Sequence, residues 1–504
     1  MNDLREMVFN NPELLRNVRI QLRPKRMLMA ASITAILSLI ILPALWSNVG
    51  ATGRTGWGEQ FLITVIVVQG IAILLGGGIA CLQSISREKE LNTFDYQRIT
   101  RLSPLELTVG KLLGAPAMAY FIAISLVPAE LVGLANSTWR AGDLVDIWIL
   151  LLFGALAFHS FNLMISMLLK RTPSTGIVLL FLFFAGMPGL SWMTILFARG
   201  NHVAAASQVI KFYGVSLPST PFFSFLYASY AAWFILALER NIKRDPAAYE
   251  LLTPLQALGF AGWQNVLFIG LTPLAEFGPQ SGQMVSIWVN IMIFGALGLV
   301  LLRNRDRARR RLREMGERGL SWLEASWPAP YVIIGVIATG LLPLLLMGGN
   351  LAGPNAGRIH PEPLNMGLFF FRLTFLALWL SRDLMYLQWM YLRPGRKPLT
   401  RAMLYAFVYY SAMFVLFFTR SGSVQPAEAA FQSVFVPGRA LVLDAASWSQ
   451  ASPTWLIALA SQGVVMLFFA FLCRQELQSL ATRPKTYPTA IPPSIRPAAP
   501  PVAG

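Results

Sequence analysis

The sequence predicts an all-α polytopic membrane protein of about 12 transmembrane helices, with both termini in the cytoplasm. Three observations support this fold class. Of the 504 residues, 55% are hydrophobic and only 13% are charged, against roughly 25% charged in soluble domains. Apolar stretches of about 20 residues, the length that crosses a bilayer, recur along the whole chain. Basic residues also concentrate in alternate loops, as in helical membrane proteins.

The apolar stretches define twelve predicted spans, of which the tenth and eleventh are short. Exposed backbone groups cannot face lipid, so each span is expected to be a helix. The spans are residues 27–46, 60–83, 112–135, 144–168, 175–197, 222–239, 255–273, 284–302, 330–348, 365–381, 402–418 and 455–473.

The distribution of Lys and Arg predicts the orientation. With a cytoplasmic N-terminus, 33 of the 41 basic residues fall in inner segments and 7 in outer segments. Positive residues are retained on the inner side, so both termini are predicted to be cytoplasmic. The net charge of +17 follows from these loops. No separate basic domain is visible, and nucleic acid is not an expected partner.

Few residues in the sequence suggest catalysis, metal binding or disulfide formation. Cys81 and Cys473 stand alone near the inner ends of spans and give no disulfide framework or metal spacing. No carboxylate pair, nucleophile set or metal cluster stands out, so an enzyme is not predicted. The first 26 residues are polar and basic, unlike a signal peptide.

Residues 1–26 are predicted to contain an entry helix before the first span. Asn11 suits the cap and Pro12 the first helical position. Apolar residues then recur every fourth position, at Leu14, Val18 and Leu22. Two interpretations remain open. The helix either lies on the membrane surface as a basic amphipathic element or is an ordinary positive flank.

The loop at residues 84–111 mixes acidic and basic residues, unlike a purely basic lipid-anchoring flank. Leu91, Phe94 and Ile99 offer apolar contacts at helical spacing. A short helix with an apolar face and charged borders is typical of a docking site for a soluble partner.

The end of this loop carries a helix-start pattern. Ser103 can cap, Pro104 suits the first helical position, and Glu106 completes a capping box. This part of the loop is explained by local structure, because it begins the helix of the third span.

The loop resembles the one between the second and third spans of type-2 ABC exporter permeases. The resemblance covers about residues 1–245. Six spans, the basic entry helix and an irregular stretch at 204–222 agree with it; in that family, short re-entrant outer helices occupy the place of this stretch. The residues that match the loop pattern are Arg87, Glu88, Glu90, Thr93, Ser103, Pro104, Gly110 and Lys111.

This resemblance implies the permease subunit of an ATP-driven transporter in the cell membrane, expected to be a bacterial inner membrane. The loop would carry a coupling helix that sits in a cleft of a separate ABC ATP-binding subunit. The chain lacks a Gly-x-x-x-x-Gly-Lys-Ser/Thr phosphate loop, so that subunit would bind ATP-Mg. The expected coupling residues are Arg87, Glu88, Glu90, Leu91, Thr93, Phe94, Arg101, Ser103, Pro104, Glu106 and Lys111.

The expected domains are the entry helix at 1–26, a six-span permease domain at 27–245, a second six-span module at 246–475 and a disordered Pro-rich tail at 476–504. The second module is either a degenerate duplicate or an appended domain. A shift of 218 positions aligns the first loop with residues 303–324. The permease halves would pair as a homodimer or within one chain. A second coupling loop would use Arg305, Asp306, Leu320, Ser321 and Glu324.

Polar residues inside spans are candidates for a translocation path because their burial in lipid is costly. Glu130 either lines the path or lies near enough to the outer surface to be solvated. His159 and Asn162 are expected to be interhelical hydrogen-bond partners rather than ligands. Arg372 lies within the tenth span.

Two other functions remain open from the sequence. A secondary transporter driven by an ion gradient would need an ionisable pair near the membrane midplane, and such residues are sparse here. A non-transporting membrane scaffold is the third alternative. The substrate cannot be read from the fold class.

Overall fold

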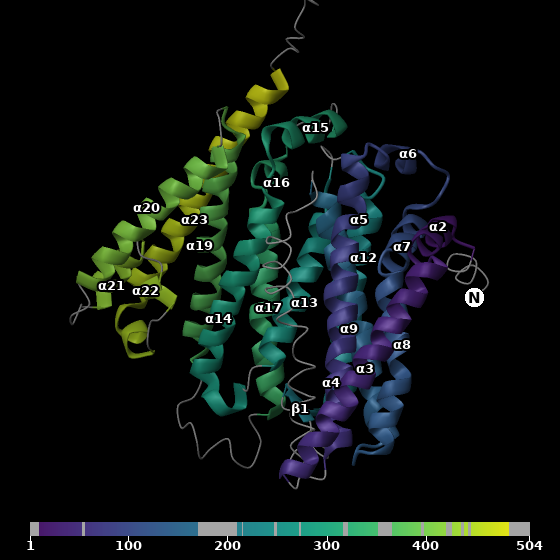
Figure 1. Ribbon diagram of the computed structural model, residues 1–504. Helices are drawn as coiled ribbons and strands as arrows, with labels where there is room; N and C mark the ends of the chain where they lie inside the picture. The colour runs from purple at the N-terminus through teal and green to yellow at the C-terminus, as the bar shows by residue number, and fades with distance from the viewer. Residues whose placement is uncertain are drawn as a thin grey trace, which may run out of the picture. The chain divides into compact units, whose positions relative to one another are not determined.

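A computed structural model describes most of the chain, and almost all of it is helical (Figure 1). The chain divides into two units, Met1–Gln256 and Ala257–Gly504. The described residues are 10–52, 56–169, 209–213, 215–245, 249–271, 274–315, 321–350, 365–394, 398–419, 426–434, 438–441 and 445–482.

The first unit consists of long helices with shorter ones at one end. Its elements are α2 (Pro12–Gln21), α3 (Pro24–Thr52), α4 (Trp57–Ile71), η1 (Ala72–Gly77), α5 (Gly78–Glu90), α6 (Phe94–Arg98), α7 (Pro104–Gly114), α8 (Ala117–Ala135), α9 (Ala141–Leu168), β1 (Val209–Phe212), β2 (Val215–Pro218) and α12 (Ser219–Asn241). Helices α2, α6 and α7 lie at the end where α5 terminates (Figure 1).

The entry helix forms as predicted. Asn11 caps α2 by accepting from the backbone N–H groups of Glu13 and Leu14, and Pro12 occupies the first position. The predicted third span is wrong at its start, because two helices meet there. The chain turns at Ala115 and Pro116, so the Ser103 cap begins the eleven-residue α7 rather than the spanning helix α8.

A π-helical segment, η1, lies within a continuous helix from Trp57 to Glu90. The imidazole Nε2 of His159 lies 2.9 Å from the carbonyl oxygen of Ile73. Wide turns of this kind arise where another group interrupts the regular hydrogen-bond ladder. A side chain at Gly77 would place its Cβ 2.4 Å from the same imidazole atom, so this close approach requires glycine.

The stretch at 204–222 differs from expectation where it is described. The resemblance implied re-entrant helices, whereas β1 and β2 form an antiparallel hairpin with Val209 opposite Pro218 and Phe212 opposite Val215. β-branched residues at three of the eight strand positions favour an extended backbone over a helix. Residues 204–208 lie outside the described part.

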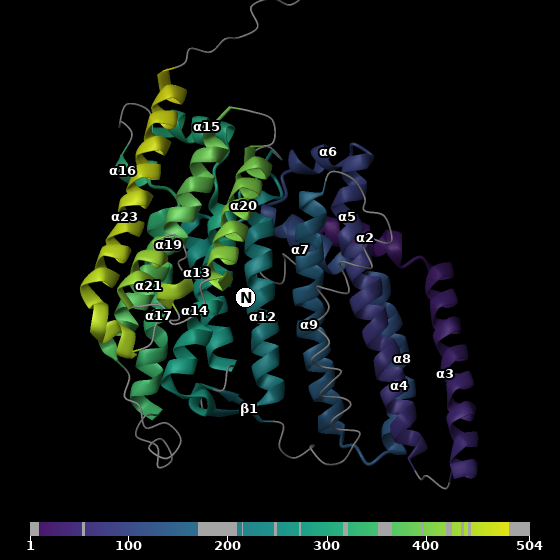
Figure 2. The same cartoon turned by 90° about the vertical axis from the view of Figure 1, so that its left-hand side faces the viewer.

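The second unit is also helical. Its elements are α13 (Pro254–Leu271), α14 (Leu274–Leu301), α15 (Arg305–Met315), α16 (Trp322–Ala325), α17 (Ala329–Asn350), α19 (Met366–Leu392), α20 (Pro398–Thr419), α21 (Pro426–Ser433), α22 (Gly438–Leu441) and α23 (Ala445–Thr482). Figure 2 shows the long helices α19 and α23 alongside each other.

Buried polar contacts join the helices of the second unit. Asn265 on α13 donates to the Oδ1 of Asn290 on α14 over 2.9 Å, and Thr339 on α17 donates to the same oxygen over 2.8 Å. On α19, Arg382 forms an ion pair with Asp383 and donates to Gln462 on α23 over 2.7 Å. Such bonds across helices hold membrane bundles together.

Within the described residues the chain is all-α apart from the hairpin, and its long apolar helices indicate a membrane protein. Among the described residues, five helices are long and apolar enough to cross a bilayer: Trp57–Glu90, Ala117–Ala135, Ala141–Leu168, Ser219–Asn241 and Pro453–Ala481. Shorter apolar helices lie at Ser286–Leu299 and Ala329–Leu341. All the predicted spans except 175–197, which lies outside the described residues, fall largely on helices.

Candidate functional site

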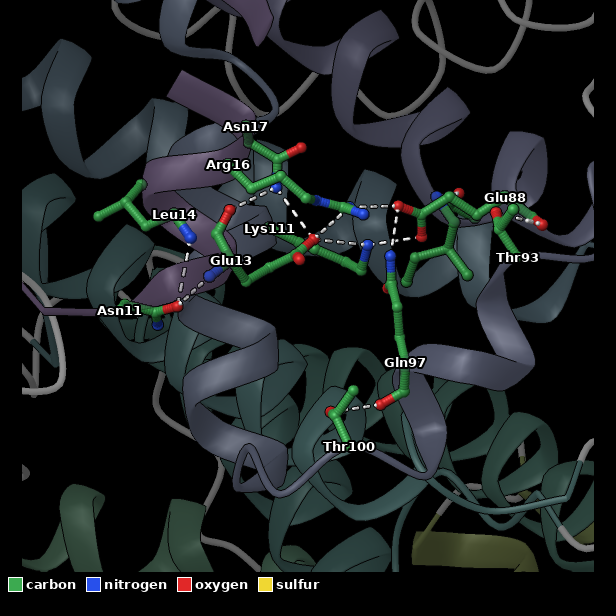
Figure 3. A network of polar contacts seen from close by, with 12 residues as sticks. Asn11, Glu13, Leu14, Arg16, Asn17, Glu88, Thr93, Gln97, Thr100 and Lys111 are labelled. Atoms are coloured by element: carbon green, nitrogen blue, oxygen red, sulfur yellow. Dashed lines mark hydrogen bonds and ion pairs between the residues drawn. The ribbon is translucent and has the colours of Figure 1, made fainter. Parts of the chain in front are cut away.

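A buried ion-pair network lies beneath the loop at 84–111 (Figure 3). At its centre Lys111 is fully buried, with its Nζ 3.0 Å from Glu13 Oε1 and 2.5 Å from Glu88 Oε2. Arg16 contacts the same two carboxylates, at 2.7 and 2.8 Å. Two cations and two carboxylates balance, and buried charges are tolerated only when paired in this way. We call Glu13, Arg16, Glu88, Gln97 and Lys111 the Lys111 network.

Helix α2 packs closely against α7. A Cβ at Gly110 would lie 2.8 Å from Glu13 Cβ, and one at Gly114 would lie 2.6 Å from Asn17 Cβ. The Asn11 side chain also donates to the Glu106 carbonyl over 2.7 Å. The glycines therefore let the entry helix approach near enough for Glu13 to reach Lys111.

The end of α5 is a Schellman motif. The Thr93 N–H bonds to the Glu88 carbonyl over 2.9 Å, and the Asn92 N–H bonds to the Lys89 carbonyl over 3.1 Å. Asn92 has a φ of 55°, a left-handed conformation that asparagine adopts more readily than most residues. The Thr93 hydroxyl also donates to the Glu88 carbonyl. Thr93 therefore ends the helix and fixes the backbone that carries Glu88.

The short helix α6 is held from two sides. Gln97 donates to Glu88 Oε1 over 2.9 Å, which ties α6 to the Lys111 network. Phe94 is buried in a cluster with residues of α5, α7, α9 and α12. The Lys243 ammonium, beyond the end of α12, donates to the Thr100 carbonyl over 2.8 Å.

Lys89 connects the same loop to α9. Its ammonium donates to the carbonyl of Met167 and, over 3.2 Å, to that of Leu169. A cation at this point satisfies carbonyls that a helix end leaves unpaired. The loop is thus fixed to α2, α7, α9 and the end of α12.

Apolar side chains nevertheless remain on the outside of this fixed loop. Leu91 is 63% exposed, Tyr96 71% and Ile99 82%. We call these three residues the docking face. Arg87, Glu90, Asp95 and Arg101 are exposed around it.

The predicted coupling residues therefore divide into two groups. Leu91, with the exposed Arg87, Glu90 and Arg101, is accessible to a partner. Phe94 was predicted to offer an apolar contact but is 2% exposed, because the core beneath α6 takes up its ring. The remaining predicted residues shape the loop, namely Glu88, Thr93, Ser103, Pro104, Glu106 and Lys111.

The capping box at the start of α7 forms as predicted. The Ser103 hydroxyl accepts from the Glu106 N–H over 3.1 Å, and the Glu106 carboxylate accepts from the Ser103 N–H over 2.6 Å. These bonds from the Ser103 backbone and hydroxyl hold the pKa of Glu106 below its usual range.

The second predicted loop is built differently. Ser321 caps α16 by accepting from the Glu324 N–H over 3.3 Å. The Glu324 carboxylate instead contacts Arg303 at 2.5 Å and Arg311 at 3.3 Å. Arg305 and Asp306 begin α15. Leu320 lies outside the described residues.

Two of the predicted membrane residues are placed as follows. Glu130 on α8 is fully buried and accepts from the indole N–H of Trp148 on α9 over 2.9 Å. The alternative in which Glu130 is solvated is therefore wrong in this structure. Its second oxygen has no hydrogen-bond partner among the described residues. Arg372 is buried on α19 in the other unit.

His159 and Asn162 differ in what they join. His159 is an interhelical partner as predicted, with Tyr120 Oη on α8 lying 2.8 Å from its Nδ1. Asn162 donates to the Phe158 carbonyl one turn earlier on its own helix, and its Oδ1 has no partner within the described part of the chain. Within the described part of the chain no interhelical bond of Asn162 is seen, and its predicted role stays a prediction.

Sequence reasoning missed several members of this site. Glu13 and Arg16 lie in the predicted entry helix, far from the loop in the sequence. Pairing across 98 positions, as for Glu13 with Lys111, or 72 positions, as for Arg16 with Glu88, has no local signal. Asn92 did carry a signal, because asparagine after a helix that ends in charged residues favours the left-handed C-terminal position. Tyr96 was overlooked between Phe94 and Ile99.

Comparison with protein-family models, with curated proteins and with solved structures gave no match to this chain.

Proposed function

We propose that this chain is the membrane permease subunit of an ATP-driven ABC transporter that works in export. In this proposal, ATP-Mg binds to a separate ATPase subunit, which docks on the loop at 84–111. The helices then rearrange around a central path in an alternating-access cycle.

One observation carries the proposal: the loop combines an exposed apolar docking face with a rigid base. Exposed Leu91, Tyr96 and Ile99 fit burial against a partner, whereas a simple connection would gain nothing from exposing them. The base extends into several helices through the Lys111 network, Lys89 and Lys243. A displacement of α6 by the ATPase subunit would therefore be transmitted to α2, α7, α9 and α12 together.

The remaining features of the proposal follow from the sequence. They are twelve spans, cytoplasmic termini, a place in a bacterial inner membrane and permease halves that pair within one chain or between two. The strong bias of Lys and Arg toward alternate loops supports the orientation. In that orientation the docking face would lie on the cytoplasmic side, where ATP is available.

The test is a site-specific cross-link to the ATPase. A photo-reactive amino acid at position 99 should capture an ATP-hydrolysing subunit encoded beside this gene, when the two are expressed together. Ile99→Ser should reduce co-purification of that subunit at least tenfold, because an exposed anchor is lost from the interface. ATP-dependent transport in inverted vesicles should fall with it.

Val215→Ser is the matched control, since Val215 is also an exposed apolar residue but lies on the hairpin. It should leave co-purification unchanged. If no ATP-hydrolysing subunit cross-links at position 99, the proposal is wrong. Equal loss in both variants would show that the effect is not specific to the docking face.

An ion-gradient transporter remains the second candidate, and Glu130 is the observation in its favour. A buried carboxylate with one unpartnered oxygen is a group that binds protons or cations in membrane transporters. Transport that persists without ATP, collapses with the proton gradient and is lost in Glu130→Gln would favour this function over the first.

A further inference from the structure

A buried cluster of polar side chains joins three helices of the second unit. Asn265 on α13, Asn290 on α14 and Thr339 on α17 are all buried. The Asn265 amide donates to Asn290 Oδ1 over 2.9 Å and to Thr339 Oγ1 over 3.2 Å. Thr339 Oγ1 in turn lies 2.8 Å from Asn290 Oδ1. The three side chains therefore converge on one point, and we call them the Asn265 cluster.

This cluster holds more oxygen acceptors than its donors can serve. The Thr339 hydroxyl has one proton, but Asn290 Oδ1 lies 2.8 Å away and the Gly335 carbonyl oxygen 2.7 Å away. The Asn290 amide donates along its own helix, to the Ser286 carbonyl over 2.7 Å. Asn265 Oδ1 is buried and has no hydrogen-bond partner among the described residues. What the cluster lacks is an electropositive group.

The surroundings of the cluster are apolar. Ala261, Phe294 and Val336 lie about one turn away along the three helices, and all of them are buried. A Cβ at Gly335 would lie 2.1 Å from the Phe294 ring, so α17 approaches α14 closely here. An oxygen without a partner is costly in such an environment, and a ligand that paired with it would be stabilising.

A rotation of one amide turns the cluster into a cation site. Half a turn about the last side-chain bond exchanges the oxygen and nitrogen of an asparagine amide. Asn265 Oδ1 would then stand where its Nδ2 now lies, beside Asn290 Oδ1 and Thr339 Oγ1. These three positions are 2.9, 3.2 and 2.8 Å apart. With the Thr339 proton on the Gly335 carbonyl, three lone-pair oxygens would face one another, and only a cation between them makes this favourable.

The chemistry of the ligands selects the cation. Neutral carbonyl oxygens can replace the hydration shell of a monovalent ion. Calcium usually takes carboxylates and magnesium gives up its water reluctantly, whereas Asn265, Asn290 and Thr339 are all neutral. The oxygens are also close together, and a large ion would have to spread three packed helices. A small monovalent cation, sodium, meets both conditions.

We propose that the Asn265 cluster binds a sodium ion. The ion accepts lone pairs from Asn265 Oδ1, Asn290 Oδ1 and Thr339 Oγ1, and it ties α13, α14 and α17 together. This inference does not rest on the proposed function, because it concerns binding by this chain alone.

The test uses the purified full chain in detergent, titrated with sodium chloride while choline chloride keeps the ionic strength constant. Sodium at ten times its dissociation constant should raise the thermal midpoint by about 3–5 °C, and potassium should raise it much less. Equilibrium dialysis with radioactive sodium should show one ion bound for each chain. Thr339→Val keeps the shape of the side chain but removes an oxygen, and it should weaken sodium binding by about tenfold or more.

A second variant keeps the test interpretable if Thr339→Val unfolds. Asn265→Asp replaces a neutral ligand by a carboxylate, so at alkaline pH it should bind sodium about tenfold more tightly. Misfolding cannot produce such a gain. Gln69→Leu is the matched control, because Gln69 is also buried, donates to a carbonyl on another helix over 3.1 Å and has an unpartnered oxygen. It should keep the sodium-dependent rise in midpoint.

Four results would overturn the proposal. The same midpoint in sodium and in choline would identify the cluster as a site for water. An equal rise with potassium would contradict the argument from size. Loss of the rise in Gln69→Leu would show that the effect does not arise at this cluster. Unchanged sodium affinity in both Thr339→Val and Asn265→Asp would place the bound ion elsewhere.

Discussion

The loops at 84–111 and 303–324 share a Ser-x-x-Glu start but use the glutamate in opposite ways. Glu106 completes a capping box, whereas Glu324 binds two arginines. The buried cation also differs: the 218-position shift that aligns the loops places Ala329 opposite Lys111. A common helix-start pattern therefore says little about function, and the charges around it decide what each loop can bind.

The consequence is a division of roles. The first loop balances its buried charges and exposes apolar residues, which favours a protein partner. The second ties two arginines to Glu324 beside an apolar pocket. The duplication hypothesis does not require both loops to dock an ATPase.

The largest expected effect comes from breaking the charge balance of the first loop. Lys111→Met leaves Glu13 buried beside Glu88 with only Arg16 to compensate, and loss of one partner from a buried pair costs about 3–5 kcal/mol. The thermal midpoint of the purified chain should fall accordingly.

Lys243→Met is the control for Lys111→Met. Lys243 makes a hydrogen bond to a single carbonyl, so its loss should cost about 1 kcal/mol. If the two variants unfold at the same temperature, the Lys111 network does not hold this loop.

A smaller effect should follow from separating α2 from α7. Gly110→Ala places a methyl group 2.8 Å from Glu13 Cβ, and overpacking of this kind costs about 1–3 kcal/mol. Hydrogen exchange in α2 should accelerate, since the helix must move away.

Gly142→Ala is the control for Gly110→Ala, because it should not lower the free energy of unfolding. Nothing lies within 4 Å of its added Cβ, and alanine is a better helix former than glycine by up to about 1 kcal/mol. This variant should be unchanged or stabilised. A destabilisation equal to that of Gly110→Ala would contradict the close-approach argument.

The smallest expected effect is on the pH dependence of stability in the acidic range. The pKa of Glu324 is low because Arg303 and Arg311 outweigh the opposing effect of burial, and the pKa of Glu106 is low through its bonds to Ser103. Lowered folded-state pKa values give stability that is present at neutral pH and lost as pH falls through them, below about 4.5.

Thermal midpoints measured between pH 7 and pH 3 should therefore fall less in Glu324→Gln than in the unaltered chain. Glu106→Gln should show a smaller reduction, because Glu106 is more open to solvent. An unchanged pH profile in Glu324→Gln would argue against its ion pairs with the two arginines.

The sequence was most informative where structure depends on neighbouring residues. Capping by Asn11 and Ser103 follows from hydrogen bonds within one turn, so both were predictable. The helical character of the apolar stretches follows from the need to satisfy backbone groups in lipid.

It was least informative where distant segments meet. The partners of Lys111 lie 98 and 23 positions away, and no periodicity links them. Burial also separates residues that look alike in the sequence. Phe94 is buried in the core, whereas Ile99 is exposed. Arg382 follows the predicted tenth span directly, and only packing shows that its guanidinium is buried against Gln462.

The continuous helix from Trp57 to Glu90 is longer than a membrane requires. Its 34 residues extend about 50 Å at 1.5 Å per residue, whereas the hydrocarbon core is about 30 Å thick. In the proposed orientation the last turns project into the cytoplasm and carry Glu88 with them. A tilt of this cytoplasmic end would then be transmitted along the helix into the bilayer. The π-helical segment η1 is the point at which the helix could bend in response.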